Sequence, residues 1–176
     1  MKTKFIYLIL ALLISFQSRS QINRTTETIV ADILAQMPTD DLKHRDRVMA
    51  EMITLGEKGL ELVTDGVVPP GTGDDTEVRF ALNGLVRYAS AFGRVEEKAV
   101  AESAFLKALA KATDKEVKAF FIHQLKLVAE DKSVEAVSDY LQDERLGAPA
   151  VQLIMTVASP NAEKQLINAL TSAKGE

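Results

Sequence analysis

Asp74 and Asp75 are adjacent carboxylates at the end of a proline- and glycine-rich stretch, residues 65–76 (DGVVPPGTGDDT). Carboxylates in such a loop can coordinate Ca²⁺, cleave a glycosidic bond as an acid–base pair, or cap a helix. A calcium loop needs several oxygen ligands at alternating positions, and a glycosidase needs carboxyl groups about 5 Å or more apart. Adjacent side chains on one turn point away from each other. The sequence therefore predicts a cap on the following helix and no metal site, with a metal ion or a partner contact as the alternatives.

The two histidines, His44 and His123, are the other groups that could perform acid–base chemistry. His44 lies in a charged stretch and is expected on a solvated face. His123 lies among apolar residues, and we expect it to be partly buried and hydrogen-bonded. The sequence has no cysteine, no GxSxG, no phosphate-binding loop and no HExxH zinc motif. We therefore expect a protein that is not an enzyme and has no catalytic residues and no cofactor.

The charge of the chain bears on its partners. Its 176 residues, 47% of them hydrophobic, suffice for one compact domain or a short solenoid. Residues 1–20 contain three basic residues and no acidic one, so their removal leaves 18 basic and 25 acidic residues, a net charge of −7. A chain this acidic is not expected to bind nucleic acid or an anionic membrane as its main partner.

The first twenty residues have the layout of a signal peptide. Lys2 and Lys4 precede an unbroken apolar run over residues 5–14, and Ser18 and Ser20 supply small side chains just before Gln21. The run is shorter than the roughly 20 apolar residues that span a bilayer. We predict that residues 1–20 are cleaved and that the protein is exported, periplasmic or secreted, with no stable membrane anchor after cleavage. An uncleaved signal anchor is the alternative.

From residue 21 onward the pattern is that of amphipathic helices. Apolar residues recur at three- and four-residue spacing, and no segment alternates with period two for long enough to predict a strand. Thr25 is expected to cap the first helix, and Thr39 or Asp40 the second. Gly56 stands at a helix-ending position. The predicted fold class is all-α.

A repeat is visible in the last third of the chain. Residues 125–141 align with residues 154–170 at an offset of 29, with apolar residues over apolar ones and polar turn residues over polar ones. Two helices joined by about three polar residues and repeated near every 30 are typical of stacked helical hairpins. We predict an α-solenoid of about four antiparallel hairpins plus a leading helix over residues 21–173, and a tail at 174–176. A plain helical bundle with coincidental periodicity is the alternative.

The chain resembles the short HEAT-like repeats of bacterial exported proteins. In particular, it resembles the HEAT segment of Bacteroidetes-type proteins that also carry a 3-keto-disaccharide hydrolase domain. The similar stretches are residues 55–59 (LGEKG), 69–76 (PPGTGDDT, with the marker residues Gly73, Asp74 and Asp75), 79–82 (RFAL), 114–118 (DKEVK), 124–125 (QL) and 143–146 (DERL). That hydrolase domain is β-rich and no strand-rich segment occurs here, so its sugar-cleaving activity is not carried over.

The resemblance implies a binding face. In HEAT-like solenoids the second helices of the hairpins form a concave face that receives proteins or peptides. Candidate partner-binding residues on these helices are Glu61, Glu102, Lys107, Glu135, Asp139, Lys164 and Asn168. We expect a non-catalytic scaffold for a protein or peptide partner. The alternative is an accessory N-terminal region of a longer carbohydrate-active enzyme, with the catalytic domain elsewhere in that chain.

Overall fold

The computed structural model describes residues 24–173 and is all-helical over that range, without a strand. The predicted signal peptide (1–20) and tail (174–176) lie outside these residues. The helices are α2 (Thr26–Leu34), α3 (Leu42–Thr54), α4 (Gly56–Thr64), α5 (Thr76–Ala89), α6 (Val95–Lys111), α7 (Lys115–Leu125), α8 (Asp131–Ser138), α9 (Gly147–Ile154) and α10 (Pro160–Ala173). The all-α prediction is thereby confirmed for this part of the chain.

Side-chain oxygens accept backbone N–H groups at the beginnings of several helices. The hydroxyl of Thr25 accepts a hydrogen bond from the backbone of α2 at 3.3 Å, as predicted. Asp41, and not Thr39 or Asp40, caps α3 by accepting two backbone N–H groups at 2.9 and 3.1 Å. Asp114 caps α7 in the same way at 2.9 and 3.0 Å. Each cap satisfies N–H groups that have no partner within the helix.

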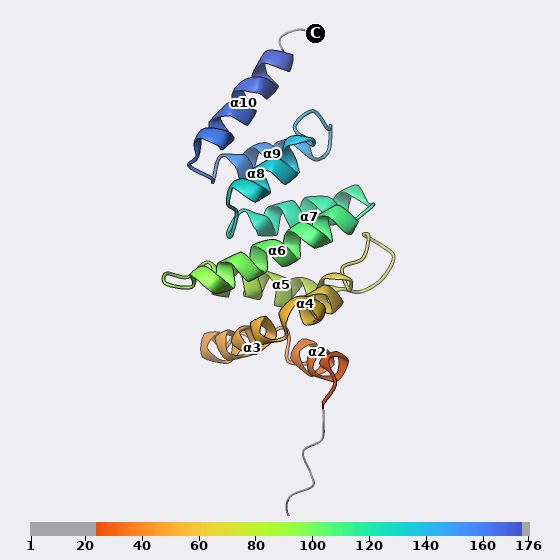
Figure 1. The fold of residues 1–176 in the computed structure, drawn as a ribbon. Helices are drawn as coiled ribbons and strands as arrows, with labels where there is room; N and C mark the ends of the chain where they lie inside the picture. Colours follow the sequence, from red (N-terminus) through yellow and green to blue (C-terminus); the bar gives the residue numbers. More distant parts are fainter. Residues whose placement is uncertain (1–23, 174–176) are drawn as a thin grey trace, which may run out of the picture.

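The helices pack in two layers that run along the molecule. In one layer α2, α4, α6, α8 and α10 contact one another in that order, and in the other α3, α5, α7 and α9 do the same. Neighbours in the sequence, such as α5 and α6 or α8 and α9, pack across the layers. The result is an elongated stack with α2 near one end and α10 at the other (Figure 1).

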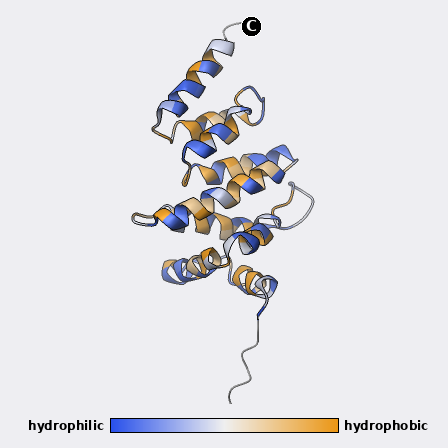
Figure 2. Ribbon diagram, in the orientation of Figure 1, coloured by the Kyte–Doolittle hydropathy of each residue, from blue (hydrophilic) through white to orange (hydrophobic). Residues whose placement is uncertain are grey.

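One hydrophobic core extends through this stack, from Val30 on α2 to Ala162 on α10. Apolar and polar residues occur together on every helix, as amphipathic helices require (Figure 2). At mid-length, Phe105 on α6 meets Phe121 on α7 edge to face, with ring centroids 6.0 Å apart. Both rings are fully buried. The core is therefore shared between successive helices and not confined to one pair.

The 29-residue offset of the sequence reappears in the helix boundaries. The last residue of α7 is 29 residues before the last residue of α9, and the first residue of α8 is 29 residues before the first residue of α10. Polar links follow a similar spacing: the Glu102 carboxylate accepts hydrogen bonds from the Glu130 N–H and the Ser133 hydroxyl, both at 2.7 Å. The Asp131 carboxylate, 29 residues after Glu102, accepts the Ser159 hydroxyl in turn. These hydrogen bonds join the beginning of α8 to α6 and the beginning of α10 to α8.

The Phe105 ring offers a test of the shared core. Replacing Phe105 by Ala is expected to lower the free energy of unfolding by about 3–5 kcal/mol, because it leaves a cavity between α6 and α7. Phe92→Ala is the matched control, since Phe92 is fully exposed in the turn before α6, and it should change stability by less than about 0.5 kcal/mol. Urea unfolding followed by circular dichroism measures both. Equal effects of the two substitutions would contradict the shared core.

Candidate functional site: a groove between α4 and α6

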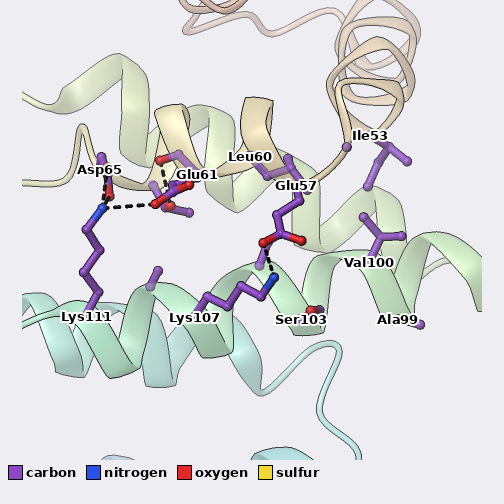
Figure 3. Close-up of a pocket in the computed structure, with 14 residues that line it drawn as sticks. Ile53, Glu57, Leu60, Glu61, Asp65, Ala99, Val100, Ser103, Lys107 and Lys111 are labelled. Carbon is purple, nitrogen blue, oxygen red and sulfur yellow. Dashed lines mark hydrogen bonds and ion pairs between the residues drawn. The ribbon is translucent and has the colours of Figure 1, made fainter. Parts of the chain in front are cut away.

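A groove of about 470 Å³ lies between α4 and α6, in the layer of α2, α4, α6, α8 and α10. We refer to it as the α4–α6 groove. Its lining comes from residues 53–65, which contain α4, and from residues 99–111 of α6 (Figure 3). Its volume falls within the range of about 300–1,000 Å³ that is typical of ligand sites.

Helix α4 reaches this position because the chain turns sharply after α3. Only Leu55 separates the two helices, and Gly56 has φ +63°, a conformation that residues with a Cβ rarely adopt. Gly59 then allows α4 to lie close to Leu55, whose Cβ would be 2.2 Å from any Cβ added at position 59. The turn directs the opposite side of α4 towards α6, where the two helices are in contact.

The floor of the α4–α6 groove is apolar. Val100, Ala104 and Ala108 follow one another at four-residue spacing along α6, so they lie in one row on that helix. Leu60 on α4 and Ile53 at the end of α3 complete the floor. A smaller cavity of about 190 Å³ adjoins the groove at the carboxyl ends of α4 and α6 and shares Thr64, Asp65, Ala108 and Lys111 with it. The two hollows together therefore follow α4 and α6 to the carboxyl ends of both helices.

The two rims of the groove carry opposite charges. Acidic residues recur every four positions along α4 and at the residue that ends it, as Glu57, Glu61 and Asp65, and lysines do the same on α6, as Lys107 and Lys111. Lys107 pairs with Glu57, while the Lys111 ammonium lies 3.3 Å from Glu61 and 2.6 Å from Asp65 (Figure 3). Hydrogen bonds to Asp65 and then Glu61 raise the pKa of Lys111. The side chains reach across the groove from one helix to the other.

These rim ion pairs are close to water. Each of their five side chains is between 44% and 73% exposed. Ion pairs in such surroundings contribute little to stability, because water and salt screen them and both side chains lose conformational freedom. An incoming charged group can therefore replace either member of a pair at small cost.

The structure brings together two of the predicted partner-binding residues, since Glu61 and Lys107 both line the α4–α6 groove. Others are exposed but separate from it: Glu135 and Asp139 at α8, and Lys164 and Asn168 on α10. The prediction for Glu102 is wrong as an accessible contact. This side chain is only 6% exposed, and its carboxylate is used by the Glu130 N–H and the Ser133 hydroxyl.

The predicted partner-binding residues did not include three residues of the rims, Glu57, Asp65 and Lys111. Their signal is present in the sequence as acidic residues at 57, 61 and 65 and lysines at 107 and 111, which places each set on one side of its helix. The repeat prediction places these two helices on one face, but nothing in the sequence shows which of their side chains meet. Their contact is a tertiary one, and it creates the groove.

The acidic pair in the loop before α5 performs two different structural tasks. One Asp74 oxygen accepts the Thr76 N–H at 3.0 Å and the Thr76 hydroxyl at 2.7 Å, so Asp74 caps α5 as predicted. Asp75 makes no cap hydrogen bond to α5, which corrects the prediction for this residue. Its carboxylate accepts the Val68 N–H at 2.9 Å and the Arg79 Nε at 2.8 Å.

Asp75 and Arg79 together hold the loop against the helix. Arg79 also donates to the Val68 carbonyl at 3.0 Å, and its guanidinium lies 4.5 Å from the centre of the Phe120 ring. Burial raises the pKa of Asp75, but hydrogen bonds from Arg79 and Val68 outweigh burial and leave that pKa below its usual value. The marker residue Gly73 is exposed. Both acids thus have structural partners within the chain.

The two histidines lie apart from the α4–α6 groove. His44 is partly exposed, and its Nδ1 lies 3.2 Å from an Arg47 nitrogen. His123 is exposed as a whole, although part of its ring is buried, so it is more accessible than predicted. Burial of part of the ring, followed by the charges of Lys126 and Arg145, lowers the pKa of His123. Neither histidine has a position from which it could act on a ligand in the groove.

Among residues 24–173, no group of three or more histidine, cysteine, aspartate or glutamate side chains is arranged to hold a metal ion. Over the same residues, none of the helices combines the length and the apolar character needed to cross a membrane.

Comparison of the chain with protein-family models, with curated proteins and with solved structures gives no match.

Asp75 provides a test of how the loop is held. Asp75→Asn is expected to lower the free energy of unfolding by about 1–3 kcal/mol at pH 7, because a charge-assisted bond to Arg79 is lost. The pKa of Asp75 is lower in the folded chain, so its contribution is full above about pH 4 and disappears as the pH falls through the folded pKa.

The difference in melting temperature between the wild type and Asp75→Asn should therefore become smaller in thermal melts recorded below pH 4. Asp46→Asn, at an exposed position on α3, serves as the control and should melt like the wild type. A difference for Asp75→Asn that stays constant down to pH 2 would contradict this role.

Proposed function

We propose that this protein is an exported, non-catalytic scaffold that binds a protein or peptide partner through the layer of α4, α6, α8 and α10. The observation that carries the proposal is the α4–α6 groove, which combines an apolar floor with exposed charges on that layer. Sites that bind proteins commonly place polar rims around a small apolar centre. In this proposal the folded chain is a HEAT-like α-solenoid of about four helical hairpins with α2 as the leading helix.

The solenoid part of the proposal is supported by the order of contacts. Each helix packs on the next member of its own layer and on its neighbour in the sequence, as expected for stacked helical hairpins. Ion pairs recur at about one repeat length. Lys115 pairs with Asp143, 28 residues away, and Glu116 pairs with Arg145, 29 residues away. Such regular spacing favours tandem units over an irregular bundle.

The chemistry of the groove favours binding over catalysis. Of its fourteen lining residues, none is a histidine or a cysteine, and its only hydroxyl side chains are Thr64 and Ser103. The Thr64 hydroxyl donates to the Glu61 carbonyl at 3.0 Å within its own helix. Neither hydroxyl is hydrogen-bonded to a side chain that could act as its base, as an activated nucleophile for acyl transfer requires.

The export part of the proposal depends on residues 1–20. We expect that the protein produced in a Gram-negative host is recovered outside the cytoplasm with Gln21 as its first residue. Intact-mass measurement and N-terminal sequencing of the purified protein check this. Recovery of a full-length chain in the membrane fraction would show an uncleaved anchor instead, and recovery in the cytoplasm would contradict export.

The binding part is tested by affinity capture with immobilised residues 21–176, followed by a binding measurement with each purified captured protein. The variant Glu61→Lys, Glu135→Lys, Asp139→Lys reverses exposed acids on α4 and α8, and a true partner should bind it at least about ten-fold more weakly. Asp46→Lys, Glu51→Lys, Glu77→Lys makes the same charge change on α3 and α5 and should bind normally. A partner affected only by this control set would place the binding face in the other layer.

A further inference from the structure

We infer that the α4–α6 groove receives one amphipathic helix of a partner protein, with basic residues along the edge that faces α4 and acidic residues along the edge that faces α6. This inference rests on the proposed function and specifies the chemistry of the partner. It is carried by three features of the groove: the row of apolar residues on its floor, the charge rows on its rims, and the exposure of the ion pairs that now join these rims.

The floor fits a helix in length and pattern. The part of α6 that lines the groove, residues 99–111, extends about 18 Å at 1.5 Å per residue, which equals about three turns of a second helix laid beside it. Val100, Ala104 and Ala108 form a row of small or medium side chains. Small side chains let a partner helix approach closely, and its own residues at positions i, i+4 and i+8 can lie over this row.

The rims match a helix in spacing. The carboxylates of Glu57, Glu61 and Asp65 and the ammonium groups of Lys107 and Lys111 each recur every four residues, a rise of about 6 Å. Lysines or arginines at four-residue spacing on a partner helix have the same rise. They can therefore meet the α4 carboxylates in succession, while glutamates on the other edge meet the α6 lysines.

Because the rim ion pairs are exposed, a partner helix can replace them with ion pairs of its own. A partner that separates Lys107 from Glu57 offers each of them a new opposite charge, so no charge is left buried without a partner. The present pairs are accessible to water and weak, and Lys111 is shared between Glu61 and Asp65. The α4 rim therefore has one more carboxylate than the α6 rim has ammonium groups, and a basic edge on the partner helix offsets this excess.

The last helix of a second copy of this chain is a poorer match. Helix α10 presents exposed apolar residues, Ile167 and Leu170, but its only charged residues are Glu163 and Lys164. These two are adjacent, so α10 has no row of like charges at four-residue spacing along either edge. Charge complementarity thus favours a different protein over self-association through α10.

The test uses three synthetic 15-residue helical probes and residues 21–176 of the protein. The first probe has a leucine stripe with lysines on one edge and glutamates on the other. The second has the same composition with the leucine positions shuffled, and the third has lysines on both edges. We expect the first probe to bind at least about ten-fold more tightly than the second in fluorescence anisotropy. It should also shift the methyl NMR signals of Leu60 and Val100.

Charge reversal locates the interaction. In Lys107→Glu, Lys111→Glu both rims are acidic. This variant should therefore bind the third probe about ten-fold more tightly than the first, whereas the wild type should bind the first more tightly than the third. Lys43→Glu, Arg47→Glu makes the same charge change, at the same four-residue spacing, at exposed positions on α3 in the other layer and should keep the wild-type preference. Val100→Glu, at a position 36% exposed on the floor, should abolish binding of the first probe while leaving the thermal melt close to that of the wild type.

Several outcomes would overturn the inference. Equal binding of the striped and shuffled probes would show that the floor does not select a helix. Equal effects of the groove and control reversals would show a general charge effect. Sedimentation of the protein as a dimer that Lys107→Glu, Lys111→Glu dissociates would make a second copy the occupant. A captured partner insensitive to that variant overturns this inference alone, whereas the absence of any specific partner contradicts the proposed function.

Discussion

Burial of apolar surface between successive helices is the interaction on which the rest of the structure depends. The helices of this chain are short, several of them only eight or nine residues long, and isolated helices of that length are marginal in water. Each one is stabilised because its apolar side packs on the next helix of its layer and on its sequence neighbour. The continuous core from Val30 to Ala162 is the consequence of this arrangement, and the hydrophobic effect supplies most of its stability.

The same arrangement explains where the polar groups lie. Side chains at the ends of helices cap them. In the middle of α6, the buried carboxylate of Glu102 ties this helix to the beginning of α8 by accepting the Glu130 N–H and the Ser133 hydroxyl. Side chains on the outer surface of a layer meet across neighbouring helices, as Lys107 and Glu57 do. The α4–α6 groove is the place where such outer charges border an accessible apolar floor. The groove therefore follows from the way α4 and α6 are stacked, and requires no specialised loop.

The loop before α5 illustrates how a prominent sequence motif can be structural. Its glycines, prolines and paired acids form the most distinctive stretch of the chain, yet both acids are engaged by neighbouring backbone and side-chain groups. Asp74 acts over two residues and was predictable from local rules. Asp75 closes the loop by reaching back seven residues to Val68 and forward to Arg79. Its role depends on the path of the loop, which local propensities do not specify.

The sequence by itself determined the helical class, the approximate helix boundaries and the 29-residue offset, because amphipathic periodicity and capping are properties of neighbouring residues. It also identified Glu61 and Lys107 as exposed candidates, although it expected the buried Glu102 to be accessible. Only the tertiary structure decided that Glu57, Glu61 and Asp65 face Lys107 and Lys111 across an apolar floor. That pairing joins residues about fifty positions apart, and it depends on the angle at which α4 leaves α3 and on how α4 and α6 are packed. These are matters of side-chain packing between distant segments, which no local pattern encodes.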